Sequence, residues 1–194
     1  MEKDSYSHGD LANSPGTFTE DTISSETLFT GTVFEVELQA VRLIDGTKTR
    51  RELIHHSGGA CVVPVDDNGD VYLIRQYRKA FEQETLEIPA GKLDKGEDPY
   101  RCAVRELKEE TGFEADQVKS LGTIYPTPGY CDEMVHLYLA TGLRAGSQNL
   151  DPGEFLHVVK LSFDEVMDAI MDDRIRDAKT VVGMLKAKEI LKVE

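Results

Sequence analysis

The sequence predicts a protein of the α+β class, built as an α/β/α sandwich of mixed sheets with an N-terminal antiparallel hairpin ahead of it. Two observations support this prediction. Short segments with the apolar patterning of strands fill most of the chain, and only a few segments have helical character. The 194 residues are enough for one domain with a real core plus a small appendage.

The N-terminal part is expected to contain a tail and a hairpin. Residues 1–26 are rich in Ser, Thr, Asp, Glu and Gly and show no periodicity, which predicts a flexible tail. Apolar residues alternate within Phe29–Leu43, and Asp45-Gly46 is a turn signal, so Thr47–His56 is the expected returning strand. The predicted divisions are a tail at 1–26, a hairpin region at 27–57 and the main domain at 58–194.

The main domain is expected to begin with two strands around a turn and to continue with a helix. The turn is Asp66-Asp67-Asn68-Gly69. The helix has Asp98 as N-cap, Pro99 at its first position and Gly112 where a left-handed C-cap belongs. Its predicted buried side is Tyr100, Ala103, Val104, Leu107 and Thr111. The other predicted strands are 59–65, 71–77, 118–125, 134–140 and 155–161, and the other predicted helices are 163–172 and 177–191.

Composition excludes several classes of partner. The formal net charge is −14, which argues against nucleic acid, because proteins that bind it need a basic surface. No apolar run approaches the length of a membrane span, and the polar start lacks a signal core. The three cysteines, an odd number, fit neither a zinc pattern nor a disulfide framework. We therefore expect a cytoplasmic protein without nucleic-acid or membrane partners.

One short helix carries three carboxylates close together. Glu106, Glu109 and Glu110 are one, three and four residues apart, so they occupy neighbouring positions of the helix surface. Their like charges repel one another, and a hard divalent cation that prefers oxygen ligands relieves that repulsion. The alternative interpretation is a solvated acidic helix face with Arg105 in a surface ion pair.

The spacing from Gly91 to Phe113 decides between these interpretations. It matches G-x5-E-x7-R-E-U-x-E-E-x-G-U, where U is apolar, at every fixed position. The chain therefore resembles a Nudix hydrolase, and the resemblance implies the same layered fold and a Mg²⁺ site that also accepts Mn²⁺. The implied metal ligands are the Ala90 carbonyl, Glu106, Glu109 and Glu110. The implied catalytic residues are Arg105, Glu109, Glu110 and Glu154, the last from a mobile loop at 151–155.

Segments beside this motif resemble the ADP-ribose pyrophosphatase branch of that family. They are Arg75-Gln76-Tyr77-Arg78 and Glu87-Ile88-Pro89-Ala90 before it, and Pro126-Thr-Pro-Gly-Tyr130 with Glu133 after it. The resemblance implies a homodimer in which the hairpin region crosses to the second subunit. The implied substrate-binding residues are Arg51, Arg78, Glu87, Pro128, Gly129 and Glu133.

The predicted reaction is the Mg²⁺-dependent hydrolysis of ADP-ribose or a related nucleoside diphosphate sugar. The chain has no tryptophan to stack on adenine, so the sequence does not indicate which nucleobase is bound. GDP-mannose, ADP-glucose, dinucleoside polyphosphates and modified nucleoside triphosphates are alternative substrates. A sensing module that binds nucleotides without catalysis is a more distant alternative, because such modules usually lose carboxylates of the motif.

Overall fold

The structure is a computed structural model that describes residues 18–191. Its helices are α1 (Pro99–Thr111), α2 (Phe163–Met171) and α3 (Ala178–Leu191). Its strands are β1 (Asp21–Thr30), β2 (Phe34–Arg42), β3 (Lys48–His56), β4 (Gly59–Pro64), β5 (Asp70–Arg78), β6 (Gln83–Glu87), β7 (Ala90–Lys92), β8 (Phe113–Ile124), β9 (Val135–Ala145) and β10 (Leu156–Ser162). No helix within 18–191 is long and apolar enough to cross a membrane.

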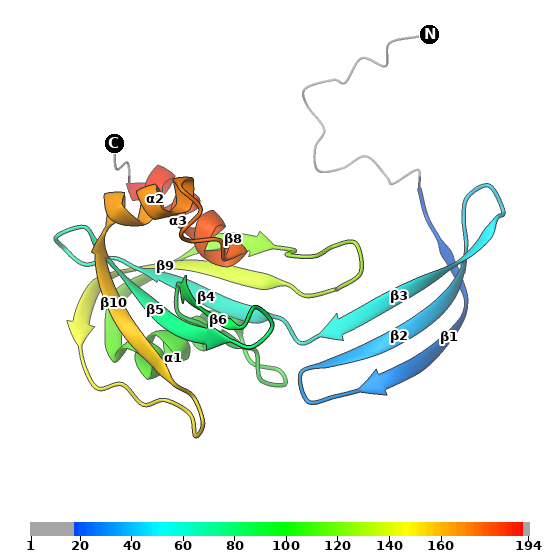
Figure 1. Ribbon diagram of the computed structural model, residues 1–194, viewed down its shortest axis with the longest axis horizontal. Coiled ribbons are helices and arrows are strands. Elements are labelled where there is room, and N and C mark those ends of the chain that lie inside the picture. The colour runs from blue at the N-terminus through cyan, green and yellow to red at the C-terminus, as the bar shows by residue number, and fades with distance from the viewer. Residues whose placement is uncertain (1–17, 192–194) are drawn as a thin grey trace, which may run out of the picture.

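The described strands form three sheets. One is mixed, with order β7-β4-β9-β8, because β4 and β9 run parallel while the other pairs are antiparallel. The second has order β10-β5-β6, and the third, β1-β2-β3, extends away from the body at the N-terminal end (Figure 1). Helix α1 lies on one side of the body sheets, and α2 and α3 lie on the other (Figure 1). The predicted α+β class and layered sandwich are confirmed.

Strand β4 is the centre of this arrangement, and all its residues are buried. Successive side chains of a strand point to opposite faces. Cys61 and Val63 accordingly pack in the cluster that contains Met184 of α3. Ala60 and Val62 pack on the other face, in the cluster that contains Leu107 of α1 and Tyr138 of β9. The two cores hold α1 and α3 in fixed positions on either side of the same strand.

The turn after β4 moves the chain from one sheet to another. The Gly69 N–H donates to the Asp66 carbonyl at 3.0 Å, and the Asp66 carboxylate accepts the N–H groups of Asn68 and Asp70. The predicted turn and its flanking strands are confirmed. The two sides of the turn are paired by the bridge between Val65 and Val71 and by the Asp66 N–H, which donates to the Asp70 carbonyl at 2.9 Å. Beyond it, β5 joins β10 and β6 in the second body sheet.

Helix α1 has the predicted ends and a different buried face. The Asp98 side chain accepts two N–H groups at the start, and Gly112 has φ +75° at the end. Tyr100 and Val104 are 47% and 38% exposed, so their predicted burial is wrong. The buried face contains two carboxylates, and a pattern of apolar residues alone does not include such positions. The buried residues are Cys102, Ala103, Glu106, Leu107 and Glu110.

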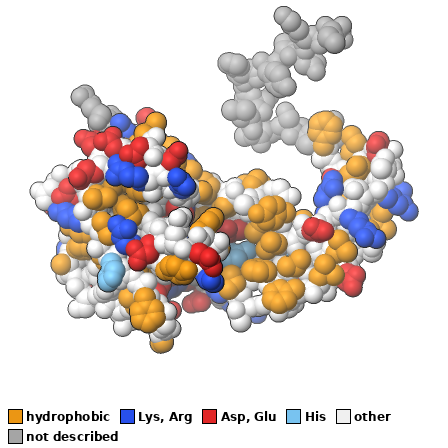
Figure 2. Space-filling view, viewed as in Figure 1, with side chains coloured by type: hydrophobic (Ala, Val, Ile, Leu, Met, Phe, Trp, Pro, Cys, Tyr) orange, Lys and Arg blue, Asp and Glu red, His pale blue; other side chains and the backbone are white. Residues whose placement is uncertain are grey.

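The N-terminal region is a three-stranded sheet. Strand β1 begins at Asp21, so the boundary expected for the tail at residue 26 is wrong; residues 1–17 of that tail lie outside the described residues. The expected strand Phe29–Leu43 is interrupted by a turn in which the Gly31 N–H donates to the Phe34 carbonyl at 3.0 Å. Figure 2 shows apolar side chains gathered over this sheet. Its exposed large apolar residues are Ile23, Leu28, Phe29, Val33, Phe34 and Ile44.

A histidine joins this sheet to the body. The loop before β9 pairs with the end of β3, where the Ile54 N–H donates to the Tyr130 carbonyl at 2.7 Å. His55 lies between Asp132 of that loop, at 2.7 Å, and Glu37 of β2, at 2.9 Å. The hydrogen bonds to these two carboxylates raise the pKa of His55. The protonated imidazole therefore stabilises the junction.

We expect the stability contributed by His55 to depend on pH. A histidine whose pKa is raised by folding contributes its full stabilisation at pH values below the unfolded pKa of 6.5. That stabilisation is lost as the pH rises through the folded pKa. The difference in unfolding free energy between wild type and His55→Gln should be largest near about pH 5.5 and shrink towards about pH 9. Chemical denaturation checks this. His157→Gln, at an exposed position of β10, is the control; a difference that does not vary with pH would contradict the prediction.

Candidate active site

Two carboxylates of α1 form the contact between this helix and the start of β7. Glu110 is only 1% exposed, and its Oε2 accepts the Ala90 N–H at 2.8 Å. A Cβ atom at Gly91 would lie 1.6 Å from the Glu106 Oε1, which is a clash. Glycine is therefore required at this position, because the Glu106 carboxylate occupies the space of a side chain.

Burial makes the charged forms of both groups unfavourable. Burial, with a smaller contribution from the negative charge of Glu154, raises the pKa of Glu110 to about 8 and that of Glu106 to about 6. For Glu106, the neighbouring Arg105 guanidinium opposes this rise. A bound cation would offset the cost of ionising these two buried carboxylates, so the pair strongly favours cation binding.

The donor set fits a divalent cation of the Mg²⁺ type. Carboxylate oxygens and a backbone carbonyl are the ligands that such a cation prefers. Within residues 18–191, no three side chains of His, Cys, Asp or Glu are already grouped as a metal cage. Glu106 Oε1 is bonded to Arg105 at 2.6 Å, and Glu110 Oε2 is bonded to Ala90. Their other carboxylate oxygens and the Ala90 carbonyl are the groups that would hold the metal.

Arg105 connects three of the four glutamates of the motif, Glu97, Glu106 and Glu109. Its Nε and Nη2 donate to the two oxygens of Glu97, both at 3.0 Å. Its Nη1 donates to Glu106 and also to Glu109, at 2.9 Å. Glu97 further accepts the Asp94 N–H at 3.0 Å. These bonds give Glu97 a structural role, since it ties the loop before α1 to the arginine that contacts Glu106 and Glu109.

We expect Arg105→Lys to lower kcat about tenfold or more, because a lysine cannot donate to three carboxylates in a planar fork. The charge is kept, so the loss would come from misplaced carboxylates. Steady-state kinetics at saturating Mg²⁺ measures it. Arg101→Lys, at an exposed position of the same helix, is the matched control. Equal kinetics of the two variants would show that the fork of Arg105 is dispensable.

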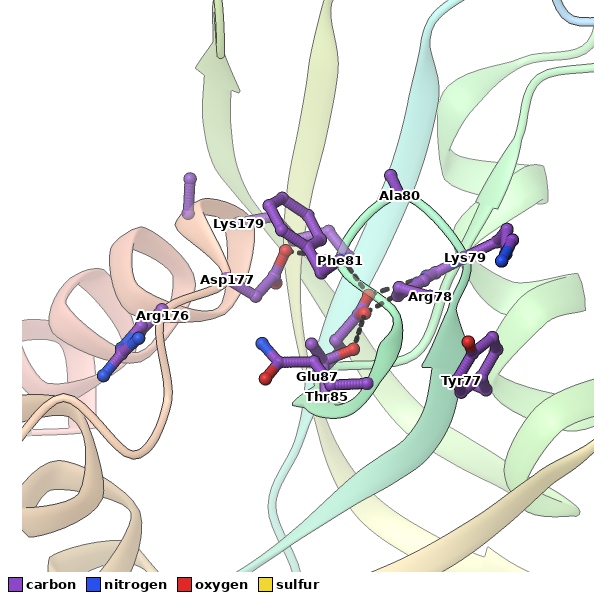
Figure 3. A pocket seen from close by; sticks show the side chains of 12 residues that line it. Tyr77, Arg78, Lys79, Ala80, Phe81, Thr85, Glu87, Arg176, Asp177 and Lys179 are labelled. Carbon is purple, nitrogen blue, oxygen red and sulfur yellow. Dashed lines mark hydrogen bonds and ion pairs between the residues drawn. The ribbon is translucent and has the colours of Figure 1, made fainter.

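A second group of charges surrounds Glu87 at the end of β6 (Figure 3). Arg78 donates to both Glu87 oxygens at 2.7 Å, and Lys179 of α3 also donates to this carboxylate. Thr85 donates its hydroxyl at 2.6 Å. Burial opposes ionisation of Glu87, but these donors outweigh it and hold its pKa at about 2. Glu87 is therefore a charged group at neutral pH.

This group borders a pocket of about 730 Å³, a size that suits a small organic ligand. Arg78 and Glu87 are on its wall, together with the aromatic rings of Tyr77 and Phe81 and the cation of Arg176. The pocket therefore combines charged groups and aromatic rings beside two residues that the sequence predicts to bind substrate.

The loop that carries Glu154 is attached to the end of α1. The Asn149 N–H donates to the Glu109 carbonyl at 3.0 Å, and Gln148 Nε2 donates to the Glu110 carbonyl at 2.6 Å. Glu154 itself accepts a long hydrogen bond, 3.4 Å, from Gln76. The structure thus brings Glu154 within electrostatic range of the α1 carboxylates.

Four predicted substrate residues lie elsewhere. Arg51 is in the N-terminal sheet and pairs with Glu20 at 2.5 Å. Pro128 and Gly129 form a turn, and Glu133 pairs with His56 at 3.5 Å, all at the junction with β3. None of these contacts involves α1 or Glu87. Within the described residues the predicted site residues fall into three places. One is the α1 centre, where Glu106 and Glu110 meet Ala90 and Gly91. The others are the group around Glu87 and the junction with β3.

Helix α3 contributes to the group around Glu87 in a way that the sequence patterns do not indicate. Asp177 accepts the Thr180 N–H at 3.0 Å as an N-cap, and it also binds Lys179 at 2.9 Å. Thr180 is fully buried, and its hydroxyl accepts the Ile88 N–H at 2.8 Å. The available signal was the capping sequence Asp177-Ala-Lys-Thr180, which marks the helix start. Nothing in that signal indicates which strand the helix start contacts.

These features are those of a hydrolase that acts on phosphorylated substrates with a divalent metal. The NUDIX domain model matches residues 55–181, and the chain belongs to this family. It is a Nudix pyrophosphohydrolase of the ADP-ribose pyrophosphatase-like branch. The motif predicted the family, and the segments beside it predicted the branch.

Several relatives resemble most of the chain. A "methanol dehydrogenase activator" of Bacillus methanolicus is 40% identical over 179 residues, which are 90% of this chain and 97% of that protein. An ADP-ribose pyrophosphatase of Bacillus subtilis is 36% identical with the same coverage. A solved structure described as an ADP compounds hydrolase has a TM-score of 0.80 at 27% identity and covers 93% of this chain and 97% of its own.

Proposed function

We propose that the protein hydrolyses the diphosphate bond of ADP-ribose, or of a closely related nucleoside diphosphate sugar, to a nucleoside monophosphate and a sugar phosphate. The observation that carries this proposal is the α1 centre, in which Glu106 and Glu110 meet Ala90 and Gly91. The names of the Bacillus subtilis and Mycobacterium tuberculosis relatives, both ADP-ribose pyrophosphatases, support the substrate; the second is 44% identical over 125 residues.

Each group of the site has a proposed task. Glu106, Glu110 and the Ala90 carbonyl hold the metal, for which we propose Mg²⁺ with Mn²⁺ as a substitute. When bound, the metal neutralises charge on the diphosphate. Arg105 holds Glu109 in place to assist. Arg78 turns from Glu87 to bind a substrate phosphate.

The chemical step needs a base and a leaving group. A water oxygen attacks one phosphorus, and the bond from that phosphorus to the bridging oxygen breaks. Glu154 is the proposed base that accepts the proton of the water. The bridging oxygen leaves with the other phosphate as part of its anionic group. The attachment of the Glu154 loop to the end of α1 supports this role, because it ties the base to the helix that carries the metal ligands.

We also propose a cytoplasmic homodimer in which the N-terminal sheet contacts the second subunit. The exposed apolar residues of this sheet, including Phe29 and Phe34, support the dimer. In it, Arg51, Pro128, Gly129 and Glu133 would contact substrate near the subunit interface. The free cysteines Cys61, Cys102 and Cys131 are consistent with a reducing compartment. Light scattering of the purified protein tests the dimer; a monomer at micromolar concentration would contradict it.

A substrate panel with Mg²⁺ tests the function. The panel contains ADP-ribose, GDP-mannose, ADP-glucose, a dinucleoside polyphosphate and nucleoside triphosphates. Phosphate release after phosphatase treatment is measured for the compounds without a terminal phosphate. For the triphosphates, which a phosphatase attacks by itself, the released pyrophosphate is measured with inorganic pyrophosphatase. We expect the highest kcat/KM for ADP-ribose. A large preference for triphosphates would refute the ADP-ribose assignment, and binding without turnover of any compound would favour a sensing module.

A further inference from the structure

The buried carboxylate of Glu87 has two cationic partners with very different surroundings (Figure 3). The side chain of Arg78 is 39% exposed and borders the open pocket. The side chain of Lys179 also lines this pocket but is only 15% exposed, and it reaches the carboxylate from the first turn of α3. Glu87 itself is 3% exposed. One partner thus has room to move, and the other is enclosed.

Lys179 is fixed by the start of its own helix. Asp177 Oδ1 accepts the Lys179 ammonium at 2.9 Å, and Asp177 Oδ2 accepts the Thr180 hydroxyl at 2.6 Å. The same hydroxyl accepts the Ile88 N–H, so the turn that carries Lys179 also holds the residue after Glu87. The lysine and the carboxylate are therefore positioned by one continuous set of hydrogen bonds.

The proposed function requires Arg78 to leave Glu87 when a substrate phosphate arrives. A buried carboxylate that loses all its cationic partners is strongly destabilised. If Arg78 were the only cationic partner of Glu87, each binding of substrate would leave the buried carboxylate without a cation. A second, immobile cation prevents this, because Glu87 stays paired while the arginine turns.

We propose that Lys179 is a positioning residue that keeps Glu87 paired and in place, and so releases Arg78 to bind the substrate phosphate. The inference rests on the proposed function and assigns the lysine no direct contact with substrate. It predicts that Lys179 and Arg78 act as one unit in substrate binding. Replacing the lysine would bind Arg78 more tightly to Glu87 and weaken its contact with phosphate.

The test is a double-mutant cycle with ADP-ribose and Mg²⁺. Lys179→Met should raise KM about tenfold with a smaller change in kcat, the size expected for loss of one charged hydrogen bond. Arg78→Gln should raise KM similarly, and the double variant should be no worse than Arg78→Gln alone. Lys179→Arg, which keeps the charge, should remain close to wild type in KM.

The matched control is Lys186→Met, in the same helix. Lys186 donates to the Leu121 carbonyl at 2.7 Å, away from Glu87, so its loss should leave KM unchanged. If Lys179→Met does not fold, as judged by circular dichroism, Lys179→Gln replaces it, because its amide can still donate to Glu87. The same direction with a smaller rise in KM is then expected.

The outcomes separate the two proposals. If wild type turns over ADP-ribose and the rises in KM from the Lys179 and Arg78 substitutions multiply in the double variant, this inference alone is overturned. A rise in KM for the Lys179 variant no larger than that of Lys186→Met would do the same. Wild type without turnover of ADP-ribose would overturn the proposed function and, with it, the inference.

Discussion

Glu110→Gln should lower kcat by about a thousandfold or more at saturating Mg²⁺, since a metal-binding carboxylate contributes several kcal/mol to the transition state. The amide has the shape of the carboxylate, and its oxygen can still accept the Ala90 N–H. The loss would therefore come from the missing charge. Glu114→Gln, which removes an exposed carboxylate paired with Lys108, is the control and should keep full activity.

The same substitution should not destabilise the metal-free protein. Burial raises the pKa of Glu110 to about 8 from an ordinary value of 4.5, so ionisation favours the unfolded state between these values. Wild type should lose stability as pH rises through this range, whereas the glutamine variant lacks this loss. Denaturation in chelator at several pH values measures the difference. A variant that is both inactive and clearly less stable near pH 8 would show that the carboxylate has a structural role instead.

Gly91→Ala should abolish most activity, with kcat/KM reduced about a hundredfold or more, because one added methyl group must displace the carboxylate of Glu106, a proposed metal ligand. A Cβ atom there would lie 1.6 Å from Oε1 and 2.6 Å from Oε2 of Glu106, so neither oxygen can stay in place. Apparent Mg²⁺ affinity should fall as well. Titration of activity against Mg²⁺ measures both effects, and near wild-type values would contradict the observed contact.

Gly69→Ala is the control that distinguishes displacement of the Glu106 carboxylate from a general loss of stability. Gly69 has φ +82°, which alanine adopts at a cost of about 1 kcal/mol, yet a Cβ atom there would meet nothing within 4 Å. We expect lower stability with unchanged kcat and KM. If both glycine variants lost activity in proportion to their stability, the Gly91 result would not report on the metal site.

Local sequence signals predicted the active helix well. The cap residues Asp98 and Gly112 depend on contacts within a few residues, and so does the spacing of Glu106 and Glu110. The bonds of Arg105 to Glu97 and Glu109 also span fewer than nine residues. Such features follow from helix geometry and are readable without the rest of the fold.

Features that depend on distant segments were not predictable in this way. Lys179 lies 92 residues after Glu87, and the sequence near either residue does not show that they meet. Strands β4 and β5, on either side of the turn at Asp66, belong to different sheets, and this depends on their pairing with strands later in the chain. Strand β1 is rich in polar residues, so its sequence resembles that of a flexible tail. The buried face of α1 was misjudged because carboxylates at Glu106 and Glu110 replace the expected apolar residues.

The position of Glu106 and Glu110 between α1 and β7 has a consequence for measuring cation preference. A cation bound there would join the helix to the strand, so it would bind the folded chain and not the unfolded one. The melting temperature should then rise with the logarithm of free cation concentration. Mg²⁺, Mn²⁺ and Ca²⁺ could thus be ranked from melting curves alone, before any substrate is known.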